Sequence, residues 1–354
     1  MLQSEYPPDE QTDLIARAAW YYYVAANNQE RTGEILGINR TKVTRLLSQA
    51  RELGLVKISI EHRLTAMFEI EETIRRHYGL DFCIATPPLA DTLPPEPDRG
   101  GSDFVARLIE SRNELARRAV GIVGASYLRK RLEAKEDLCI GVAWGRTLAA
   151  MADQLSGVSG SALKFVSLMG SLTRTAAANP FEVVHRLAAR TGGEAHFLPV
   201  PYIANSVSDR KVLLSQQSVQ ESLALARAAD FYVISVGECD EGSLLSQRGL
   251  ISREELSSVK AAGAVCDTIG KFFDASGNLI DTELNDRTLA IDLADLRSHE
   301  VILLCAGLSK RQAVKGLLNS EIVDGLVIDG DVAKLLADDI RDGGKGPGPK
   351  GVRP

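Results

Sequence analysis

The sequence has no run of about 18 apolar residues, the length that a membrane-spanning helix needs. Its opening, MLQSEYPPDE, has neither the basic flank nor the apolar stretch of an export signal. We therefore expect a soluble, cytoplasmic protein with no membrane partner.

Cysteine is scarce as well: 5 residues among 354, an odd number and widely spaced. Most lie in apolar, strand-like runs, where free thiols pack as small hydrophobes, so neither a disulfide framework nor a metal site is predicted. No stretch has the spacing of a dinucleotide-binding or Walker phosphate loop, which disfavours nicotinamide cofactors and nucleoside triphosphates. We predict no cofactor.

The length and the 45% hydrophobic content favour two domains with at least one large core. The formal net charge of −6 argues against a surface that binds polyanions everywhere. Any contact with nucleic acid must therefore come from a local basic patch.

Three helices are predicted in the first fifty residues, because apolar residues recur there at three- and four-residue spacing. The first starts near Leu14 and stops at Asn27, the second covers residues 28–36, and the third begins after Asn39. Asn28 and Asn39 are suited to cap the second and third helices, and Gly37 to end the second in the left-handed conformation.

Residues 55–62 then alternate apolar and polar side chains, as a half-buried strand of a small wing would. Two short helices joined by a glycine-containing turn and followed by a wing are typical of a winged helix-turn-helix. The expected bounds of this DNA-binding domain are residues 1–63.

The third helix is basic within an acidic protein. From Arg31 to Arg63 the chain has seven Lys or Arg against three Glu, and from Arg40 to Arg51 it has no acid. A cationic helix face is also common on plain solvated surfaces, but this contrast favours contact with DNA phosphates. The candidate DNA-binding residues are Gln29, Asn39, Arg40, Thr41, Lys42, Thr44, Arg45 and Gln49.

The aromatic run WYYY, residues 20–23, has two interpretations. It is either a stacking platform for single-stranded nucleic acid or part of a helix packed into the core. Consecutive helical residues point in different directions, which favours packing, with Tyr22 on the core side.

Residues 64–102 form a connector of a helix, a strand at residues 81–86 and a surface loop with five prolines. A long helix follows over residues 104–135, with a possible interruption at Gly121–Gly124. The glycine- and proline-rich end, residues 341–354, is expected to be disordered.

Residues 103–340 alternate short apolar runs with helical stretches, which predicts an α/β domain with a mainly parallel sheet. Four of the strands, predicted to end at Val142, Met169, Val236 and Cys305, are each followed by a glycine loop. Because the carboxyl ends of parallel strands share one edge, these loops should converge into one crevice.

Such a crevice suits a phosphorylated or carboxylated small molecule, since glycines let a ligand approach the backbone and helix N-termini offer N–H groups. Glycine after a buried strand is also commonly just a tight turn. Asp267 is of interest because a carboxylate can accept two hydroxyl hydrogen bonds, although it also suits a cap or turn. The candidate ligand-binding residues are Gly141, Trp144, Gly145, Arg146, Thr147, Gly170, Ser171, Arg174, Gly237, Glu238, Asp267 and Lys310.

From Trp20 to Leu336 the sequence resembles the SorC family of sugar-binding bacterial transcription regulators. The segments that carry the resemblance include LGINRTKVTRLLSQARELGLVKI, GVAWGRT, LPVPYIANS, GAVCDTIGKFFDASG and AGLSKRQAVKGLL. The resemblance implies a sugar-phosphate-isomerase-like effector domain that binds a sugar, polyol or sugar phosphate, and a homodimer or homotetramer on operator DNA. Thr32–Gly33 and Ala306 depart from the family pattern, and Ala306 leaves open whether the effector is phosphorylated.

We therefore predict a ligand-responsive transcriptional regulator of carbohydrate or polyol catabolism, not an enzyme. The alternative is a sugar-phosphate isomerase or deaminase with Asp267, Glu238 or Asp240 as the base. No histidine lies in a strand-end loop, which disfavours that alternative. A metal- or redox-sensing regulator would need clustered Cys and His, which the sequence lacks.

Overall fold

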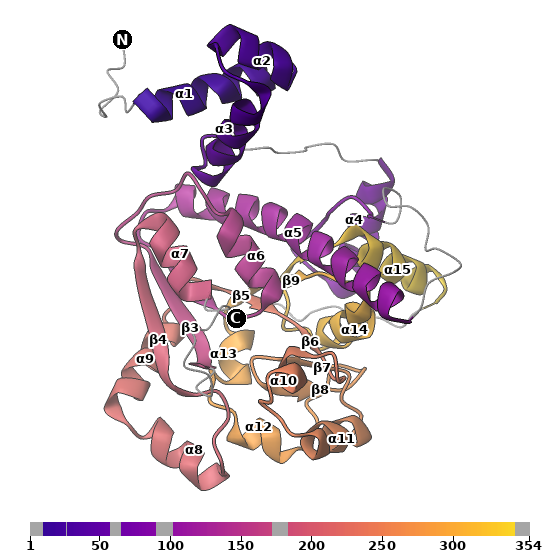
Figure 1. The fold of residues 1–354 in the computed structure, drawn as a ribbon. Coiled ribbons are helices and arrows are strands. Elements are labelled where there is room, and N and C mark those ends of the chain that lie inside the picture. Colours follow the sequence, from indigo (N-terminus) through magenta and orange to yellow (C-terminus); the bar gives the residue numbers. More distant parts are fainter. Residues whose placement is uncertain (1–9, 26, 57–64, 90–101, 172–182, 344–354) are drawn as a thin grey trace. The chain divides into compact units, whose positions relative to one another are not determined.

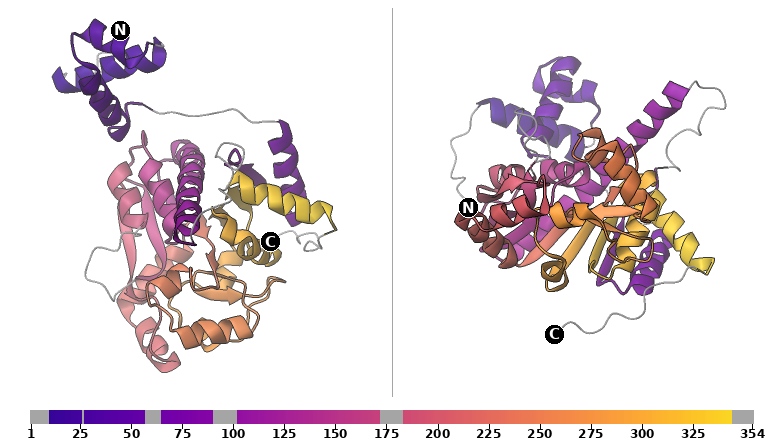
Figure 2. Two further views of the ribbon diagram at one scale, coloured as in Figure 1. Left: turned by 45° about the vertical axis from the view of Figure 1, so that its right-hand side comes forward. Right: turned by 90° about the horizontal axis from the view of Figure 1, so that it is seen from below.

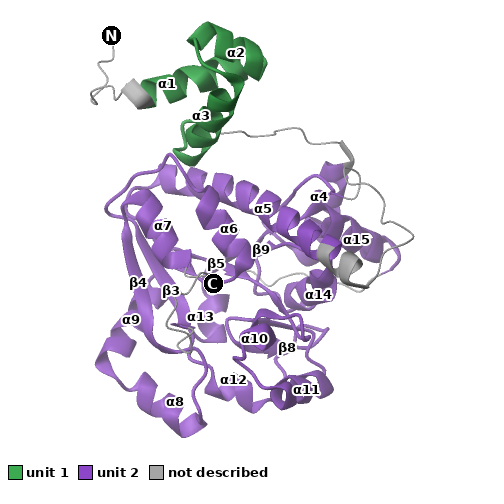
Figure 3. Cartoon of the chain, in the orientation of Figure 1, with its two compact units in different colours: residues 1–62 green, residues 63–354 purple. Residues whose placement is uncertain are grey.

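The computed structural model describes residues 10–25, 27–56, 65–89, 102–171 and 183–343. The chain divides into two compact units, residues 1–62 and 63–354 (Figures 1 and 3). Each unit has its own hydrophobic core. Arg174, residues 57–62 of the predicted wing (55–62) and residues 344–354 of the predicted tail (341–354) lie outside the described residues.

The first unit consists of α1 (Glu10–Ala19), a π-helical turn (Trp20–Val24), α2 (Gln29–Leu36) and α3 (Arg40–Glu52). The predicted caps are confirmed: Asn28 accepts a hydrogen bond from the backbone N–H of Arg31, and Asn39 accepts one from that of Lys42. Gly37 ends α2 with φ of 67°. The two short helices are thus joined by the turn that the sequence indicated.

The core of this unit is small, and α1 and α3 supply it. Its buried residues are Ile15, Ala18, Ala19, Val43, Leu46, Leu47 and Ala50. Tyr22 packs against this core, whereas Trp20 is 54% exposed. Leu53 is 60% exposed, because it follows the last turn of α3.

The second unit is built on a seven-stranded sheet in the order β1-β10-β9-β5-β2-β3-β4, with every neighbouring pair parallel. The strands are β1 (Phe82–Ala85), β2 (Cys139–Val142), β3 (Lys164–Ser171), β4 (Glu194–Pro201), β5 (Phe231–Ser235), β9 (Glu300–Cys305) and β10 (Gly325–Ile328). The mainly parallel α/β fold predicted from the sequence is confirmed. From β2 the chain proceeds outward to β3 and β4, then returns to place β5 on the other side of β2.

Helices cover both faces of this sheet (Figures 1 and 2). On one face α5 (Ser102–Ala134) packs against α6 (Arg146–Gln154), and α6 packs against α7 (Val183–Thr191). Because parallel crossovers are right-handed, the return from β4 through α8 (Val207–Leu214) places α9 (Gln217–Arg227) on the opposite face. At the edge of the sheet α4 (Thr65–Tyr78) packs against β1 and α15 (Gly330–Arg341).

A small antiparallel sheet, in the order β6-β7-β8, is inserted between β5 and β9. Its strands are β6 (Gly237–Glu238), β7 (Cys266–Thr268) and β8 (Lys271–Phe273). The helices of the same segment are α10 (Leu244–Gln247), α11 (Arg253–Ala261), α12 (Glu283–Arg287) and α13 (Leu293–Arg297), and α14 (Arg311–Asn319) packs against β6 and β7.

Three details differ from the sequence prediction. The long helix α5 passes through Gly121 without interruption, since that glycine packs so closely on α6 that a Cβ would lie 2.7 Å from the carbonyl carbon of Ala150. Strand β3 continues through Ser171 instead of ending at Met169. Gly237 and Glu238, predicted to lie in a loop, pair with β7.

Candidate functional site

A cavity opens where β2 and β5 end, at the point where the strand order reverses. Ligands in open α/β sheets usually bind at such a switch point, because the loops from the two strands diverge there. The cavity encloses about 610 Å³, including its open mouth. Its lining residues are Arg117, Ala143, Trp144, Gly145, Arg146, Thr147, Met169, Tyr202, Ser235, Val236, Gly237, Glu238, Leu244, Leu245, Asp267, Thr268, Ile269 and Lys310.

The N-terminus of α6 forms one wall of this cavity. Gly145 caps the helix without a side-chain hydrogen bond, which leaves the first backbone N–H groups available to a ligand. Its φ of 156° is one that residues with a side chain rarely adopt, and a Cβ at this position would lie 2.7 Å from Ser235 Oγ at the end of β5, so glycine suits this close approach. Thr147, in the first turn, is buried.

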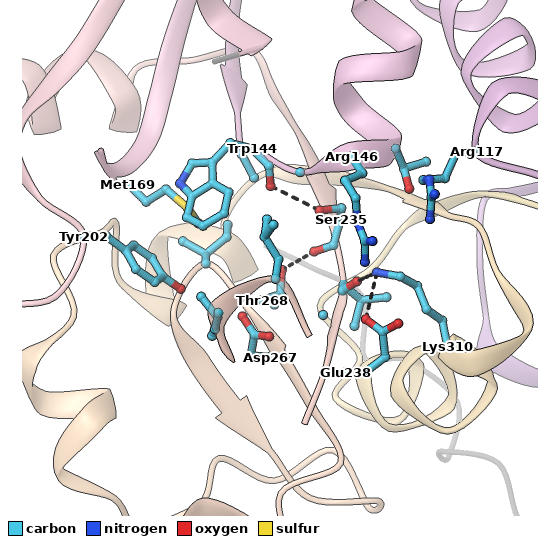
Figure 4. A pocket seen from close by; sticks show the side chains of 18 residues that line it. Arg117, Trp144, Arg146, Met169, Tyr202, Ser235, Glu238, Asp267, Thr268 and Lys310 are labelled. Atoms are coloured by element: carbon cyan, nitrogen blue, oxygen red, sulfur yellow. Dashed lines mark hydrogen bonds and ion pairs between the residues drawn. The ribbon is translucent and has the colours of Figure 1, made fainter. Parts of the chain in front are cut away.

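A largely shielded ion pair forms the opposite wall (Figure 4). Lys310 Nζ lies 3.3 Å from Glu238 Oε2 and also donates to the carbonyl oxygen of Val236. Ser309 Oγ donates to the second oxygen of Glu238 at 2.8 Å. Burial alone would raise the pKa of Glu238, but the charge of Lys310 and these hydrogen bonds outweigh it and lower the pKa below its ordinary value.

Asp267 lies between the ion pair and the aromatic wall and is only 7% exposed. Burial and the neighbouring charge of Glu238 raise its pKa to about 7, against the opposing effect of Lys310. No hydrogen bond to this carboxyl group is found in the described part of the chain. Near neutral pH the group can therefore both donate and accept hydrogen bonds with a ligand.

The remaining wall is apolar and aromatic. Trp144 and Tyr202 meet edge to face with ring centroids 5.2 Å apart, beside Met169 (Figure 4). An aromatic wall facing buried acids and helix N–H groups suits a small polyhydroxylated molecule, which has C–H faces and a rim of hydroxyls.

The candidate DNA-binding face is the outer side of α3. Arg40, Thr41, Lys42, Thr44 and Arg45 are all exposed there. The three cations have no carboxylate within 4.0 Å among the residues that the structure describes. These unneutralised cations are available to phosphates or base edges.

Gln29 of α2 joins this face, because its side-chain oxygen accepts hydrogen bonds from Arg40 at 3.4 Å and from Thr44 at 3.2 Å. Two other predicted residues are less available. Asn39 uses its side-chain oxygen to cap α3, and Gln49 is half-buried.

The sequence matches the family model described as "Putative sugar-binding domain" over residues 62–337. It is 33% identical to the erythritol catabolism regulatory protein EryD of Brucella abortus, over 93% of this chain and 97% of that protein. The chain belongs to the SorC-type family of sugar-binding transcriptional regulators.

Two more distant relatives resemble the chain over most of its length. The deoxyribonucleoside regulator of Bacillus subtilis is 26% identical over 94% of this chain and 99% of its own length. The sorbitol operon regulator SorC of Klebsiella pneumoniae shares the fold, with a TM-score of 0.63 and 23% identity over 93% of this chain and 100% of that chain. In the chain described in this structure, no helix within the described ranges is long and apolar enough to cross a membrane.

Eight of the predicted ligand-binding residues of this regulator line the cavity together. They are Trp144, Gly145, Arg146, Thr147, Gly237, Glu238, Asp267 and Lys310. Although they come from four separate segments, the parallel sheet places these segments at one edge, as the sequence argument required.

Three other predicted residues lie elsewhere in the regulator. Gly141 is inside β2, where a Cβ would lie 2.4 Å from the ring of Tyr232, so this glycine serves packing. Gly170 and Ser171 line a smaller neighbouring cavity that shares Ala143, Trp144 and Met169 with the main one. They are displaced from the main cavity because β3 extends further than predicted.

Sequence reasoning missed several lining residues. Arg117 lies in the middle of α5, where nothing in the helical sequence pattern distinguishes it from a surface arginine. Tyr202 lies in LPVPYIANS, a segment that carried the family resemblance without an assigned role. Ser235 and Thr268 also line the cavity, but they belong to strands, whereas the sequence argument considered only the loops after strands.

Asp240, which was considered as a catalytic base, is exposed and does not line the cavity.

Proposed function

We propose that this family member is a DNA-binding regulator of an operon for carbohydrate or polyol catabolism, switched by a small polyhydroxylated effector in the β2–β5 cavity. One observation carries the proposal: the helix N–H groups, the Lys310–Glu238 pair and Asp267 converge on one cavity beside an aromatic wall. Such a constellation supplies the donors and acceptors that recognise vicinal hydroxyls.

The effector class follows from this chemistry and from the relatives. The name of the 33% identical relative concerns erythritol catabolism. A four- to six-carbon polyol or sugar is therefore the proposed ligand. Trp144 and Tyr202 would contact its carbon face, while Thr147, Asp267 and Glu238 would bind hydroxyls.

The proposed DNA contacts are made from α3. Arg40, Thr41, Thr44, Arg45 and Gln49 would reach base edges in the major groove, and Lys42 and Gln29 would contact phosphates. Asn39, as the helix cap, would present the first N–H groups of α3 to a phosphate.

We further propose that the protein acts in the cytoplasm as a homodimer or homotetramer. Effector binding would favour one arrangement of the subunits and so change the spacing of two reading helices against operator half-sites about one helical turn apart. No enzymatic turnover is part of the proposal.

The test combines effector screening with DNA binding by the full chain. Duplexes selected from randomised DNA would serve as operator probes in fluorescence anisotropy. At least one tetritol, pentitol, hexitol, parent sugar or sugar phosphate should raise the melting temperature and change the operator affinity.

Asp267→Asn should weaken that response at least tenfold, whereas Asp240→Asn, an exposed change outside the cavity, should leave it unchanged. The proposal would be contradicted if the protein bound no DNA specifically. It would also be contradicted if no compound of the panel changed the melting temperature or the operator affinity.

A further inference from the structure

We infer that Glu238 makes the cavity select an uncharged polyhydroxylated effector over its phosphate ester. The inference rests on the proposed function and narrows it to one ligand class. It is carried by one observation: each cation that lines the cavity, among the residues that the structure describes, lies within ion-pair distance of a carboxylate of the same chain.

Lys310, at the N-terminus of α14, is the cation best placed to contact a phosphate. It lines the cavity, and its side chain is 13% exposed. Its ammonium group is instead shared between Glu238 and the carbonyl oxygen of Val236. The Glu238 side chain is 11% exposed, so both charges are largely desolvated and their attraction is weakly screened. A phosphate could recruit Lys310 only by leaving the Glu238 carboxylate buried without its partner.

The two arginines of the cavity are paired as well. The Arg117 side chain is 6% exposed and lies 2.6 Å from Glu110 and 2.9 Å from Glu114. Arg146 lies 4.0 Å from the same Glu110. Within the described chain, all three cations that line the cavity are therefore within ion-pair distance of a carboxylate.

Asp267 adds a second acid to the lining, next to Glu238. A phosphate dianion in this space would face two carboxyl groups and would lose its own hydration without gaining an unpaired cation. The N-terminus of α6 offers N–H groups, which a hydroxyl oxygen can use as well as a phosphate can. The balance of charges therefore favours hydroxyls.

The experiment compares matched pairs by isothermal titration calorimetry on the full-length wild-type protein. The pairs are erythritol, ribitol, glucitol and ribose, each with its terminal monophosphate, and inorganic phosphate is titrated alone. We expect the best-bound uncharged compound to bind at least tenfold more tightly than its ester, and inorganic phosphate not to compete with it.

Glu238→Gln should then raise the affinity for the ester at least tenfold, because it frees Lys310, and should not raise that for the uncharged parent, whose hydroxyls Glu238 is proposed to bind. The control Glu241→Gln removes the same charge from an exposed position of the same segment and should reproduce the wild type. The double variant Glu238→Gln with Lys310→Met removes both buried charges and should lose the gain for the ester.

The outcomes separate the two proposals. Tighter binding of an ester than of its parent by the wild type would overturn this inference and leave the proposed function standing. An unchanged preference in folded Glu238→Gln would overturn the role of Glu238. Binding of no pair at all would overturn the proposed function, and this inference with it.

Discussion

The two units of this regulator use positive charge in opposite ways. In the first unit, Arg40, Lys42 and Arg45 stand exposed on α3 with no carboxylate within ion-pair distance in the described structure. In the second, Lys310 and Arg117 are nearly buried, and each is held by an acid of the same chain. Exposed, unpaired cations suit a polyanion, whereas paired and desolvated ones suit a ligand recognised through hydroxyls.

The units also differ in how they are held together. Among the described residues of the first unit, seven small and medium-sized ones form the buried core, while the second unit buries both faces of a seven-stranded sheet. A small core loses a larger share of its stability with each residue removed. The first unit should therefore unfold first, and a single truncation should separate the two transitions.

The largest expected effect is on the folding of the first unit. Leu46→Ala removes a side chain that is 3% exposed in its core and should cost about 3 kcal/mol of unfolding free energy. Chemical denaturation would be followed through Trp20 in a Trp144→Phe background, so that this unit alone is reported. The transition of the second unit, followed separately through Trp144 in a Trp20→Phe background, should be unchanged.

Leu53→Ala is the matched control, because Leu53 follows the same helix and is 60% exposed. It should shift the stability by less than about 0.5 kcal/mol. Equal effects of the two variants would show that the core around α3 is not packed as described.

The second prediction concerns the exposed cations. Replacing Arg40 and Arg45 together by alanine should weaken operator binding by about 100-fold, since each base or phosphate contact contributes about 1–3 kcal/mol. Because both arginines are proposed to read base edges and not phosphates, the slope of log affinity against log salt should change little. Fluorescence anisotropy over a range of salt concentrations measures both quantities.

Arg17→Ala provides the control for this loss. Arg17 is an exposed arginine of α1 that pairs with Asp13 at 2.7 Å, so its removal takes away a charge outside the proposed reading face. If Arg17→Ala and the double variant lost comparable operator affinity, DNA binding would depend on net charge alone and not on the proposed reading face.

The smallest effect tests the buried acid of the second unit. Because the pKa of Asp267 rises from its ordinary 3.8 to about 7 on folding, its protonation stabilises the native state below pH 3.8. That contribution is lost as the pH rises from there through 7. Asp267→Asn, which cannot ionise, should gain about 2 kcal/mol of unfolding free energy relative to the wild type between pH 5 and pH 8.

Urea denaturation at a series of pH values measures this difference without any ligand. The curve for Asp240→Asn, an exposed acid nearby, should run parallel to that of the wild type. A parallel curve for Asp267→Asn would mean that the carboxyl group is not desolvated in the folded protein.

Local features were predicted most accurately from the sequence. The caps Asn28 and Asn39, the left-handed Gly37 and the strand ending at Cys305 depend on neighbours within a few residues, so their residue types are sufficient evidence. The converging strand ends could be predicted as well, since parallel strands share an edge by geometry. The uninterrupted α5 could not be predicted, because the glycine at position 121 is needed for close packing against α6, which is distant in the sequence.

The sequence by itself determined a basic helix preceded by a turn, an α/β pattern and a set of glycine loops with polar side chains, because propensity and periodicity act over short distances. Only the tertiary structure decided that β5 returns beside β2, that Arg117 of α5 reaches the cavity and that Glu238 meets Lys310 across 72 positions. Those contacts depend on how the sheet is ordered and how its helices pack, and no spacing along the chain encodes them.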